Sequence, residues 1–394
     1  MTNIENILSA NKNAFYVLDT GVLKARINYL KSRLPKCVTI CYAAKANPFV
    51  VKEIDEDIEK FELCSPGEVD ICNTLGIATK KMVISGVYKT PEFIERLVKD
   101  ESFEGVYTIE SLSQYRLLVE LSNKYERDVR VLVRLTNSSQ FGVNEQDVED
   151  ILADLKGHKR VECIGIQFFS GTQKSSVKKL RRELEHMDAF LLHLRDDLGF
   201  EAEYFEYGGG FPVAYFENEE FDEEAYLAEF ADALNAMTFK AKVTLELGRS
   251  VVASCGKYYT HVVDMKCNKG INYMLVDGGM HHIVYFGQQM AMKHPLMSVV
   301  GKEGSKDGDV WTICGALCSM NDILAKQVLL PMDIAVGDTL CFENAGAYCL
   351  MEGISLFLSR DLPSVYIVRE NGETLLVREA FETSTLNTPN YNKQ

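Results

Sequence analysis

The stretch GVYTIESLSQYRLLVELSNKYERDVRVLVRL, residues 105–135, contains a strand, a helix and a second strand in succession. Its two ends, 105–109 and 129–135, are apolar and rich in β-branched residues, which is typical of buried strands. The segment between them, 111–126, carries apolar residues three and four positions apart and therefore predicts an amphipathic helix. The whole stretch is one strand–helix–strand unit of an α/β protein.

The same alternation extends in both directions from this repeat. Helical patterns are expected at about 20–33 and at 175–197. Further strand-like runs lie at 38–44, 61–65, 81–86, 161–169, 202–208 and 243–247. Eight strands that alternate with helices predict a closed (β/α)8 TIM barrel over residues 20–255. An open, doubly wound sheet is the alternative that this pattern leaves open.

Residues 256–394 follow a different pattern. Helical periodicity nearly vanishes, and short strand-like runs such as YYTHVVDMKC, NYMLVDG and VWTICGAL follow one another. Asn371-Gly372 lies between the last two runs and is a strong signal for a two-residue hairpin turn. We expect a separate C-terminal β-barrel domain from residues 256–394, to which residues 1–19 contribute the strand FYVLD.

The composition argues against several classes of partner. With 57 acidic against 42 basic residues and a net charge of -15, the chain lacks the basic face that nucleic acids or an anionic membrane would need. No apolar run approaches the roughly 18 residues of a membrane span, and the N-terminus lacks the features of a signal peptide. Eleven cysteines without a CxxC pair favour free thiols and argue against a metal site. We therefore expect a cytoplasmic protein.

A lysine ends the first strand of the expected barrel, in the sequence YAAKANP, residues 42–48. Functional residues of such barrels gather at the C-terminal ends of the strands, so Lys45 is expected to face the barrel mouth. A desolvated lysine there has a lowered pKa and is a nucleophile toward aldehydes. The alternative interpretation is a surface lysine at the start of a loop.

Three other strand ends offer ligands for a phosphate. Gly208, Gly209 and Gly210 allow backbone N–H groups to approach an anion closely, although glycines also serve plain tight turns. The last strand of the barrel ends in Glu246-Leu247-Gly248-Arg249, and Arg249 is a candidate second ligand. The loop of residues 170–173, SGTQ, adds a hydroxyl. A nucleophilic lysine beside a phosphate site suggests pyridoxal 5'-phosphate as cofactor.

These motifs resemble those of a known family, the fold-type III pyridoxal-phosphate decarboxylases of ornithine, arginine and diaminopimelate. The resemblance covers nearly the whole chain and implies an alanine-racemase-like barrel followed by a β-barrel domain. The motifs follow in the family's order: FYVLD, YAAKANP, CSPGE, ISG, SQFG, SGTQ, YGGGFP, ELGR, VDGGM, CGALCSMND and GAYCLM.

The resemblance also implies a role for each matching residue. Lys45 would hold the cofactor aldehyde, and Glu246 would face the pyridine nitrogen and keep it protonated. Cys318 would enter the active site of the partner in a head-to-tail homodimer and protonate the α-carbon after CO2 departs. The phosphate would be bound by the remaining matches: Thr172, Gly208, Gly209, Gly210, Arg249 and Tyr348.

Three departures from the family's pattern bear on the substrate. Phe169 stands where the family commonly places a histidine flat against the cofactor ring. Ser319 replaces the acidic residue that holds the distal ammonium of the substrate, and a neutral hydroxyl cannot compensate a buried cation. The arginine of diaminopimelate enzymes is missing after VDGGM, where His281 and His282 stand instead. We include Ser319, His281 and His282 as candidate substrate-binding residues.

The substrate is therefore expected to be an amino acid, free or carrier-linked, whose distal group is not a free ammonium. This combination resembles the branch that includes the butirosin decarboxylase acting on a glutamyl group on an acyl carrier protein; enzymes of siderophore assembly lie near it. Decarboxylation of diaminopimelate, ornithine or lysine is the alternative, with Glu352 or Asp277 binding the ammonium. An amino-acid racemase and an inactive binding homologue are alternatives of another class.

Overall fold

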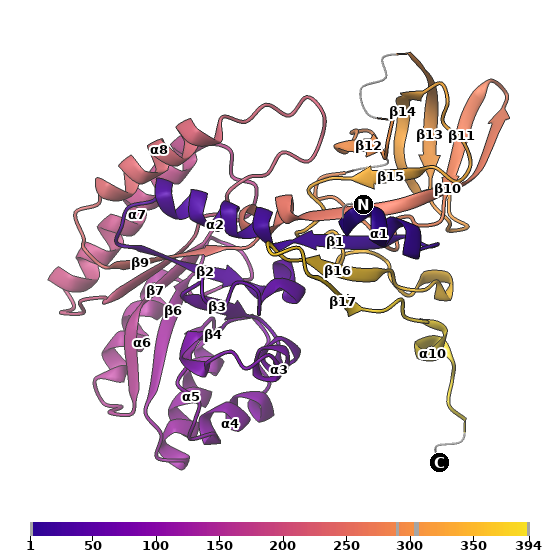
Figure 1. Cartoon of the computed structure of the whole chain (residues 1–394). Coiled ribbons are helices and arrows are strands. Elements are labelled where there is room, and N and C mark those ends of the chain that lie inside the picture. Colours follow the sequence, from indigo (N-terminus) through magenta and orange to yellow (C-terminus); the bar gives the residue numbers. More distant parts are fainter. Residues whose placement is uncertain (1–2, 289–290, 303–306, 392–394) are drawn as a thin grey trace. The chain divides into compact units, whose positions relative to one another are not determined.

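The structure is a computed structural model that describes residues 3–288, 291–302 and 307–391. The chain divides into two compact units (Figure 1). One consists of residues 27–213 and 221–251, and we call it the barrel unit. The other consists of residues 1–26, 214–220 and 252–394, and we call it the β unit.

The barrel unit contains a closed sheet of eight parallel strands, which confirms the predicted TIM barrel. The strands are β2 (Val38–Ala43), β3 (Lys60–Leu63), β4 (Met82–Ile84), β5 (Val106–Ile109), β6 (Val129–Leu135), β7 (Val161–Phe169), β8 (Tyr204–Gly208) and β9 (Lys242–Leu247). Parallel pairing of β9 with β2, from Val243 beside Val38 to Leu247 beside Tyr42, closes the ring and excludes the open sheet.

The helices of this unit lie outside its strands (Figure 1). They are α3 (Pro66–Thr74), α4 (Pro91–Lys99), α5 (Leu112–Lys124), α6 (Glu145–Leu155), α7 (Val177–Asp196) and α8 (Glu223–Asn235), together with residues 27–33 of α2 (Thr20–Arg33) and 249–251 of α9 (Arg249–Val252). Helix α5 shows why they form. Ser111 accepts a hydrogen bond from the backbone N–H of Gln114 and caps the first turn, while Leu118 and Leu121 are buried.

The interior of the barrel changes character along its axis. Cys41, Val83, Val106, Leu132 and Ile164 form a buried apolar cluster between the strands. Near the C-terminal ends, buried polar side chains take over on β3, β6, β7, β8 and β9: Glu62, Arg134, Gln167, Glu206 and Glu246. A polar layer of this kind is costly unless its groups pair with one another, so it marks this end of the barrel as the functional one.

The β unit is a branched, mixed sheet of nine strands. Its main path runs β14-β13-β11-β10-β1-β16-β17, and β15 pairs with both β10 and β12. The elements are α1 (Asn3–Ala10), β1 (Phe15–Asp19), β10 (Gly256–Asn268), β11 (Ile271–Val276), β12 (Met297–Val299), β13 (Gly308–Cys314), β14 (Ile323–Pro331), β15 (Thr339–Phe342), β16 (Ser364–Val368), β17 (Thr374–Arg378) and α10 (Ser384–Asn387).

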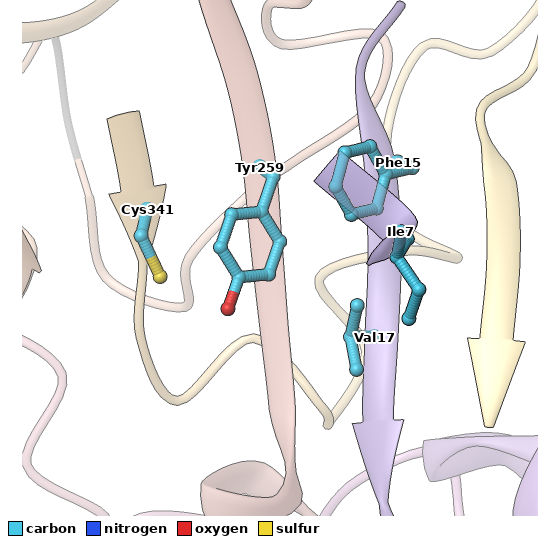
Figure 2. Close-up of a cluster of buried hydrophobic side chains, with 5 residues drawn as sticks. All are labelled: Ile7, Phe15, Val17, Tyr259 and Cys341. Atoms are coloured by element: carbon cyan, nitrogen blue, oxygen red, sulfur yellow. The ribbon is translucent and has the colours of Figure 1, made fainter. Parts of the chain in front are cut away.

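Strand β1 lies in the middle of this sheet, antiparallel to β10 and parallel to β16. It anchors a core of five buried side chains (Figure 2), in which the rings of Phe15 and Tyr259 stack at 5.0 Å. The hairpin between β16 and β17 differs from the two-residue turn that we predicted. Arg369 donates its N–H to the carbonyl of Glu373, so three residues form the loop, and Gly372 takes the left-handed φ of 84°.

Candidate active site

Lys45 follows β2 directly, on the short 3-10 turn Ala44–Ala46. Its Nζ lies 2.6 Å from Oε2 of Glu62 and 3.7 Å from Oε1 of Glu246. The lysine side chain is 39% exposed, whereas the two carboxylates are almost fully buried. The amine is therefore held at the barrel mouth by buried charges and remains reachable from solvent.

Two carboxylates beside Lys45 have opposite pKa shifts. Burial and, next to it, the negative charge of Glu62 raise the pKa of Glu246 to about 8. Burial also acts on Glu62, but the charge and hydrogen bond of Lys45 outweigh it and lower the pKa of Glu62. Near neutral pH, Glu62 is thus the carboxylate paired with Lys45, and Glu246 carries a proton that it shares with Glu62 through a hydrogen bond.

Gln167 bridges the buried acids from β7. Its Nε2 donates to Oε1 of Glu206 at 2.6 Å and to Oε2 of Glu246 at 3.3 Å. Burial raises the pKa of Glu206 to about 7, with Glu62 adding to the shift. Two of these three carboxyl groups, those of Glu62 and Glu246, face Lys45 directly, and Glu206 joins them through Gln167. The layer can therefore stabilise a further cationic or proton-bearing group.

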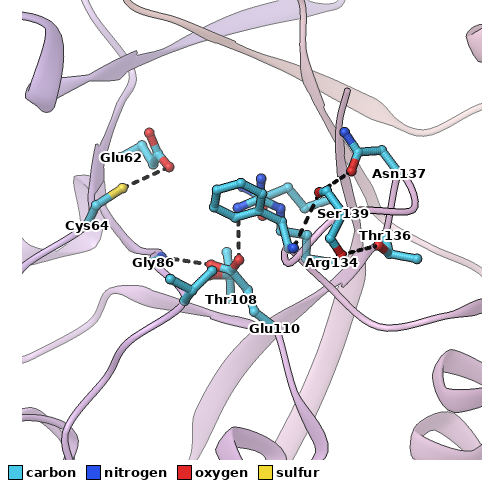
Figure 3. A network of polar contacts seen from close by, with 12 residues as sticks. Glu62, Cys64, Gly86, Thr108, Glu110, Arg134, Thr136, Asn137 and Ser139 are labelled. Carbon is cyan, nitrogen blue, oxygen red and sulfur yellow. Dashed lines mark hydrogen bonds and ion pairs between the residues drawn. The ribbon is translucent and has the colours of Figure 1, made fainter. Parts of the chain in front are cut away.

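A second polar network lies on the neighbouring strands (Figure 3). Arg134 on β6 makes a buried ion pair of 3.0 Å with Glu110, which also accepts the backbone N–H of Gly86. The guanidinium lies over the ring of Phe169, 5.8 Å from its centroid. Phe169 is therefore held at the mouth by a cation–π contact.

The glycines after β8 form a cradle for an anion. Gly210 has a left-handed φ of 58°, and a Cβ added there would come within 2.2 Å of the carbonyl oxygen of Gly171. Among the hydrogen bonds of the described residues, none is donated by the backbone N–H of Gly209, Gly210 or Phe211. Unpaired N–H groups on a loop without Cβ atoms are what a phosphate requires.

Arg249 and Thr172 meet beside this cradle. Nε of Arg249 donates to Oγ1 of Thr172 at 3.3 Å, which brings together two of the predicted phosphate ligands. The cradle also adjoins Glu246, because Gly208 and Glu246 are register partners on β8 and β9. One strand end thus suits a phosphate and its neighbour suits a ring nitrogen, an arrangement that fits pyridoxal phosphate.

The β unit holds the remaining predicted residues. Cys318 is exposed and Ser319 is half-buried on the loop 314–322, and one buried carboxylate fixes this loop. Asp322 accepts the N–H of Met280 through Oδ1 and the N–H of Leu317 through Oδ2, each at 2.7 Å. Tyr348 is half-buried and has a φ of 63°. This conformation is rare for a bulky residue and is often found at functional sites.

His281 and His282 are both buried, with their rings 3.9 Å apart. His282 bonds the hydroxyl of Tyr258 at 3.0 Å and the carbonyl of Asp361 at 2.8 Å. Burial lowers the pKa of His281 to about 3 and that of His282 to about 4. Both are therefore neutral at pH 7, and they line a cavity of about 540 Å³ within the β unit.

Sequence reasoning missed several residues of the barrel mouth, among them Glu62, Arg134, Gln167 and Lys174. The signal was present for the first three, because each is a polar residue between apolar neighbours in the C-terminal half of its strand. Lys174 gave no such signal, since it lies in a polar loop after β7.

None of the described helices is long and apolar enough to cross a membrane. Over the same described residues, no cluster of three or more His, Cys, Asp or Glu side chains could hold a metal ion.

The fold and this mouth define a pyridoxal-phosphate enzyme, and comparison with known proteins identifies its family. The model of the pyridoxal-dependent decarboxylases, pyridoxal binding domain, matches residues 20–253. The chain belongs to this family and is a pyridoxal-phosphate-dependent decarboxylase.

Individual relatives are similar over most of their length. The L-glutamyl-(BtrI acyl-carrier protein) decarboxylase of Niallia circulans is 26% identical over 92% of this chain and 90% of that protein. The diaminopimelate decarboxylase of Aquifex aeolicus is 26% identical over 92% and 88%. The crystal structure of diaminopimelate decarboxylase from Helicobacter pylori superposes with a TM-score of 0.84 at 23% identity, covering 97% of this chain and 98% of that one.

Proposed function

We propose that this decarboxylase acts on an amino acid whose side chain ends in an acylated, carboxylated or carrier-linked group instead of a free ammonium. The observation that carries the proposal is the chemistry of the loop 314–322, CGALCSMND. Asp322 is its one acidic residue, and it is 1% exposed.

The carboxylate of Asp322 is fully committed within the loop. Each of its oxygens accepts a backbone N–H, and the side chain is buried, so it is poorly placed to bind a substrate ammonium as well. Ser319 takes the position of the family's acidic residue, and its Oγ accepts the N–H of Asn321 at 3.2 Å. A loop without an available negative charge favours a substrate without a distal cation, because desolvating an unpaired ammonium costs several kcal/mol.

Of the two other acids that could bind the ammonium, Glu352 and Asp277, the second is also engaged. Oδ1 of Asp277 accepts from Thr260 at 2.6 Å, and Oδ2 lies 2.9 Å from Nδ1 of His261. Although burial opposes it, these hydrogen bonds lower the pKa of Asp277. Asp277 is therefore already compensated and gains little from a second cation.

The names of relatives support both this proposal and its alternative. The Niallia circulans relative acts on a carrier-linked glutamyl group. A 2-[(L-alanin-3-ylcarbamoyl)methyl]-2-hydroxybutanedioate decarboxylase of Staphylococcus aureus is 24% identical over 91% of this chain and 94% of that protein. Diaminopimelate decarboxylases are equally similar, so the choice rests on the loop chemistry described above.

In this proposal each residue at the mouth has one task. When bound, pyridoxal phosphate supplies an electron sink for the bonding electrons of the departing carboxylate. Lys45 provides the amine that binds the cofactor aldehyde, and Glu246 provides the proton facing the ring nitrogen. Phe169 packs against the ring, and the unpaired N–H groups of the glycine loop bind the phosphate together with three side chains: Thr172, Arg249 and Tyr348.

Cys318 has the task of returning a proton to the α-carbon from its Sγ. The thiol is exposed on the β unit, as a residue that serves a second chain would be. We propose that two chains form a head-to-tail homodimer in which the Cys318 loop completes the partner's site, and that the enzyme works in the cytoplasm.

A substrate panel tests the proposal. We expect kcat/KM for Nδ-acylated ornithine or for a glutamyl thioester of pantetheine to exceed that for free ornithine and lysine. Ser319→Asp should shift the substrate preference toward the free diamines. Ser319→Asn, whose side chain has the size of aspartate but no charge, should leave that preference unchanged. A wild-type preference for a free diamine of more than about tenfold, or about 1.4 kcal/mol, would reject the Ser319 argument.

A further inference from the structure

Lys174 is a buried lysine to which neither the sequence nor the proposed mechanism gives a role. Its side chain is 4% exposed, directly behind the glycine loop after β8. Four acceptors surround Nζ: Oγ of Ser170 at 3.1 Å, Oε2 of Glu183 at 2.9 Å, the hydroxyl of Tyr207 at 3.0 Å and the carbonyl of Gly208 at 3.1 Å. The lysine thus joins the end of β7, helix α7 and the end of β8.

The hydrogen-bond count shows that Lys174 cannot itself bind a phosphate. An ammonium has three protons, and four acceptors already compete for them. The hydroxyls of Ser170 and Tyr207 donate to Glu183 at 2.6 Å and 2.7 Å, so both neighbours are oriented toward the same carboxylate. Lys174 therefore binds the carbonyl side of the glycine loop, and it has no free proton to donate to a ligand.

Its backbone adds a second bond to the same loop. The N–H of Lys174 donates to the carbonyl of Gly210 at 2.9 Å, while Nζ donates to the carbonyl of Gly208. Because a trans peptide is planar, its N–H points opposite to its C=O. The N–H groups of Gly209 and Phe211 consequently point away from Lys174, and they are among those without a partner in the described residues.

The residue before Lys174 strengthens this attachment. Gln173 donates from Nε2 to the carbonyl of Val213 at 2.9 Å and accepts the N–H of Val213 through Oε1 at 2.7 Å. The loop after β8 is therefore held by side-chain and backbone bonds at both of its ends. Its shape is set before any ligand arrives, which is the condition for strong anion binding by N–H groups.

We propose that Lys174 is a positioning residue that orients the backbone N–H groups of the glycine loop and thereby sets the preference of the site for phosphorylated over unphosphorylated cofactor. The inference rests on the proposed phosphate role of Gly208, Gly209 and Gly210. It goes beyond that role because it assigns the geometry of the cradle to one side chain outside it.

The test compares pyridoxal phosphate with pyridoxal, which lacks the phosphate. Dissociation constants for both are measured by absorbance on the full-length chain stripped of cofactor, for the wild type and for Lys174→Met. Methionine keeps the length and the apolar packing but removes the donors. We expect Lys174→Met to lower the ratio of the two affinities by about tenfold or more, with pyridoxal binding changed by less than about threefold.

Lys89→Met is the matched control. Lys89 is likewise buried, in the loop between β4 and α4, where Nζ bonds the carbonyl of Gly86 at 2.7 Å and Oε1 of Gln114 at 3.1 Å. Losing this lysine should alter stability and leave the affinity ratio at the wild-type value. If Lys174→Met does not fold, Glu183→Gln weakens the same cluster and should lower the ratio in the same direction.

The outcomes are separable. An unchanged ratio in a folded Lys174→Met, or a parallel loss of affinity for both compounds, would overturn the positioning role. A wild-type protein that binds pyridoxal as tightly as pyridoxal phosphate would instead overturn the phosphate site in the glycine loop.

Discussion

Replacement of Glu246 by glutamine should stabilise the cofactor-free protein at alkaline pH while it disables the enzyme. The side chain is fully buried, and burial raises its pKa to about 8, with Glu62 adding to the shift and Lys45 opposing it. Glutamine has nearly the same shape and cannot ionise. It can still accept from Gln167 and donate to Glu62.

The sign of the pH effect follows from proton linkage. In the unfolded chain a glutamate has a pKa near 4.3, so the folded protein binds this proton more tightly. The free energy of unfolding of the wild type therefore falls as the pH rises from about 4.5 to about 8, because the unfolded chain ionises first. A shift of between three and four pKa units corresponds to roughly 5 kcal/mol, all of it lost above about pH 8.

Urea unfolding at pH 5 and at pH 8.5 measures this effect. The stability of Glu246→Gln relative to the wild type should increase between the two pH values by about 4 kcal/mol. With cofactor present, the variant should lose about 100-fold in kcat, because a neutral amide does not keep the ring nitrogen protonated. Equal pH dependence of unfolding in the two proteins would refute the raised pKa, and full activity would refute the role of Glu246.

Three further substitutions test other parts of the site. Lys45→Ala should abolish the visible absorbance band near 420 nm and leave the fold intact, since the lysine ends a strand outside the core; a retained band with activity would contradict the assignment. Cys318→Ala should keep the cofactor and lose most turnover, and mixing it with Lys45→Ala should restore partial activity in composite sites; mixed dimers as inactive as their parents would exclude a shared site. Gly210→Ala should weaken binding of pyridoxal phosphate by about tenfold. Gly199→Ala is the control: Gly199 has a similar positive φ of 68°, but a Cβ there has no non-neighbouring atom within 4 Å. This control should cost only about 1–2 kcal/mol of stability.

The barrel was predictable because its strands are buried on both faces and separated by amphipathic helices. That pattern depends on local sequence alone, as the stretch 105–135 illustrates. The position of Lys45 followed from the same rule, since it ends an apolar strand. The loop between β16 and β17 was misjudged because Asn371-Gly372 fits two turn lengths, and only the bond from Arg369 to Glu373 selects the longer one.

The charge pattern of the site could not be derived in the same way. Glu62 and Glu246 lie on β3 and β9, far apart in sequence, and both reach Lys45 only because the ring closes through β2. Their opposite pKa shifts arise from this mutual proximity. The role of Lys174 likewise depends on a helix and two strand ends that meet around one ammonium, a contact that no local pattern encodes.

The most direct test of the central claim, that Lys45 holds the cofactor of this decarboxylase, is to locate the covalent bond. The purified protein is reduced with borohydride in the presence of pyridoxal phosphate and digested, and the modified peptide is sequenced by mass spectrometry. We predict a single phosphopyridoxyl group on Lys45, in the peptide that contains YAAKANP. Modification of another lysine, such as Lys89 or Lys174, or a protein that releases CO2 without any modified lysine, would contradict the account.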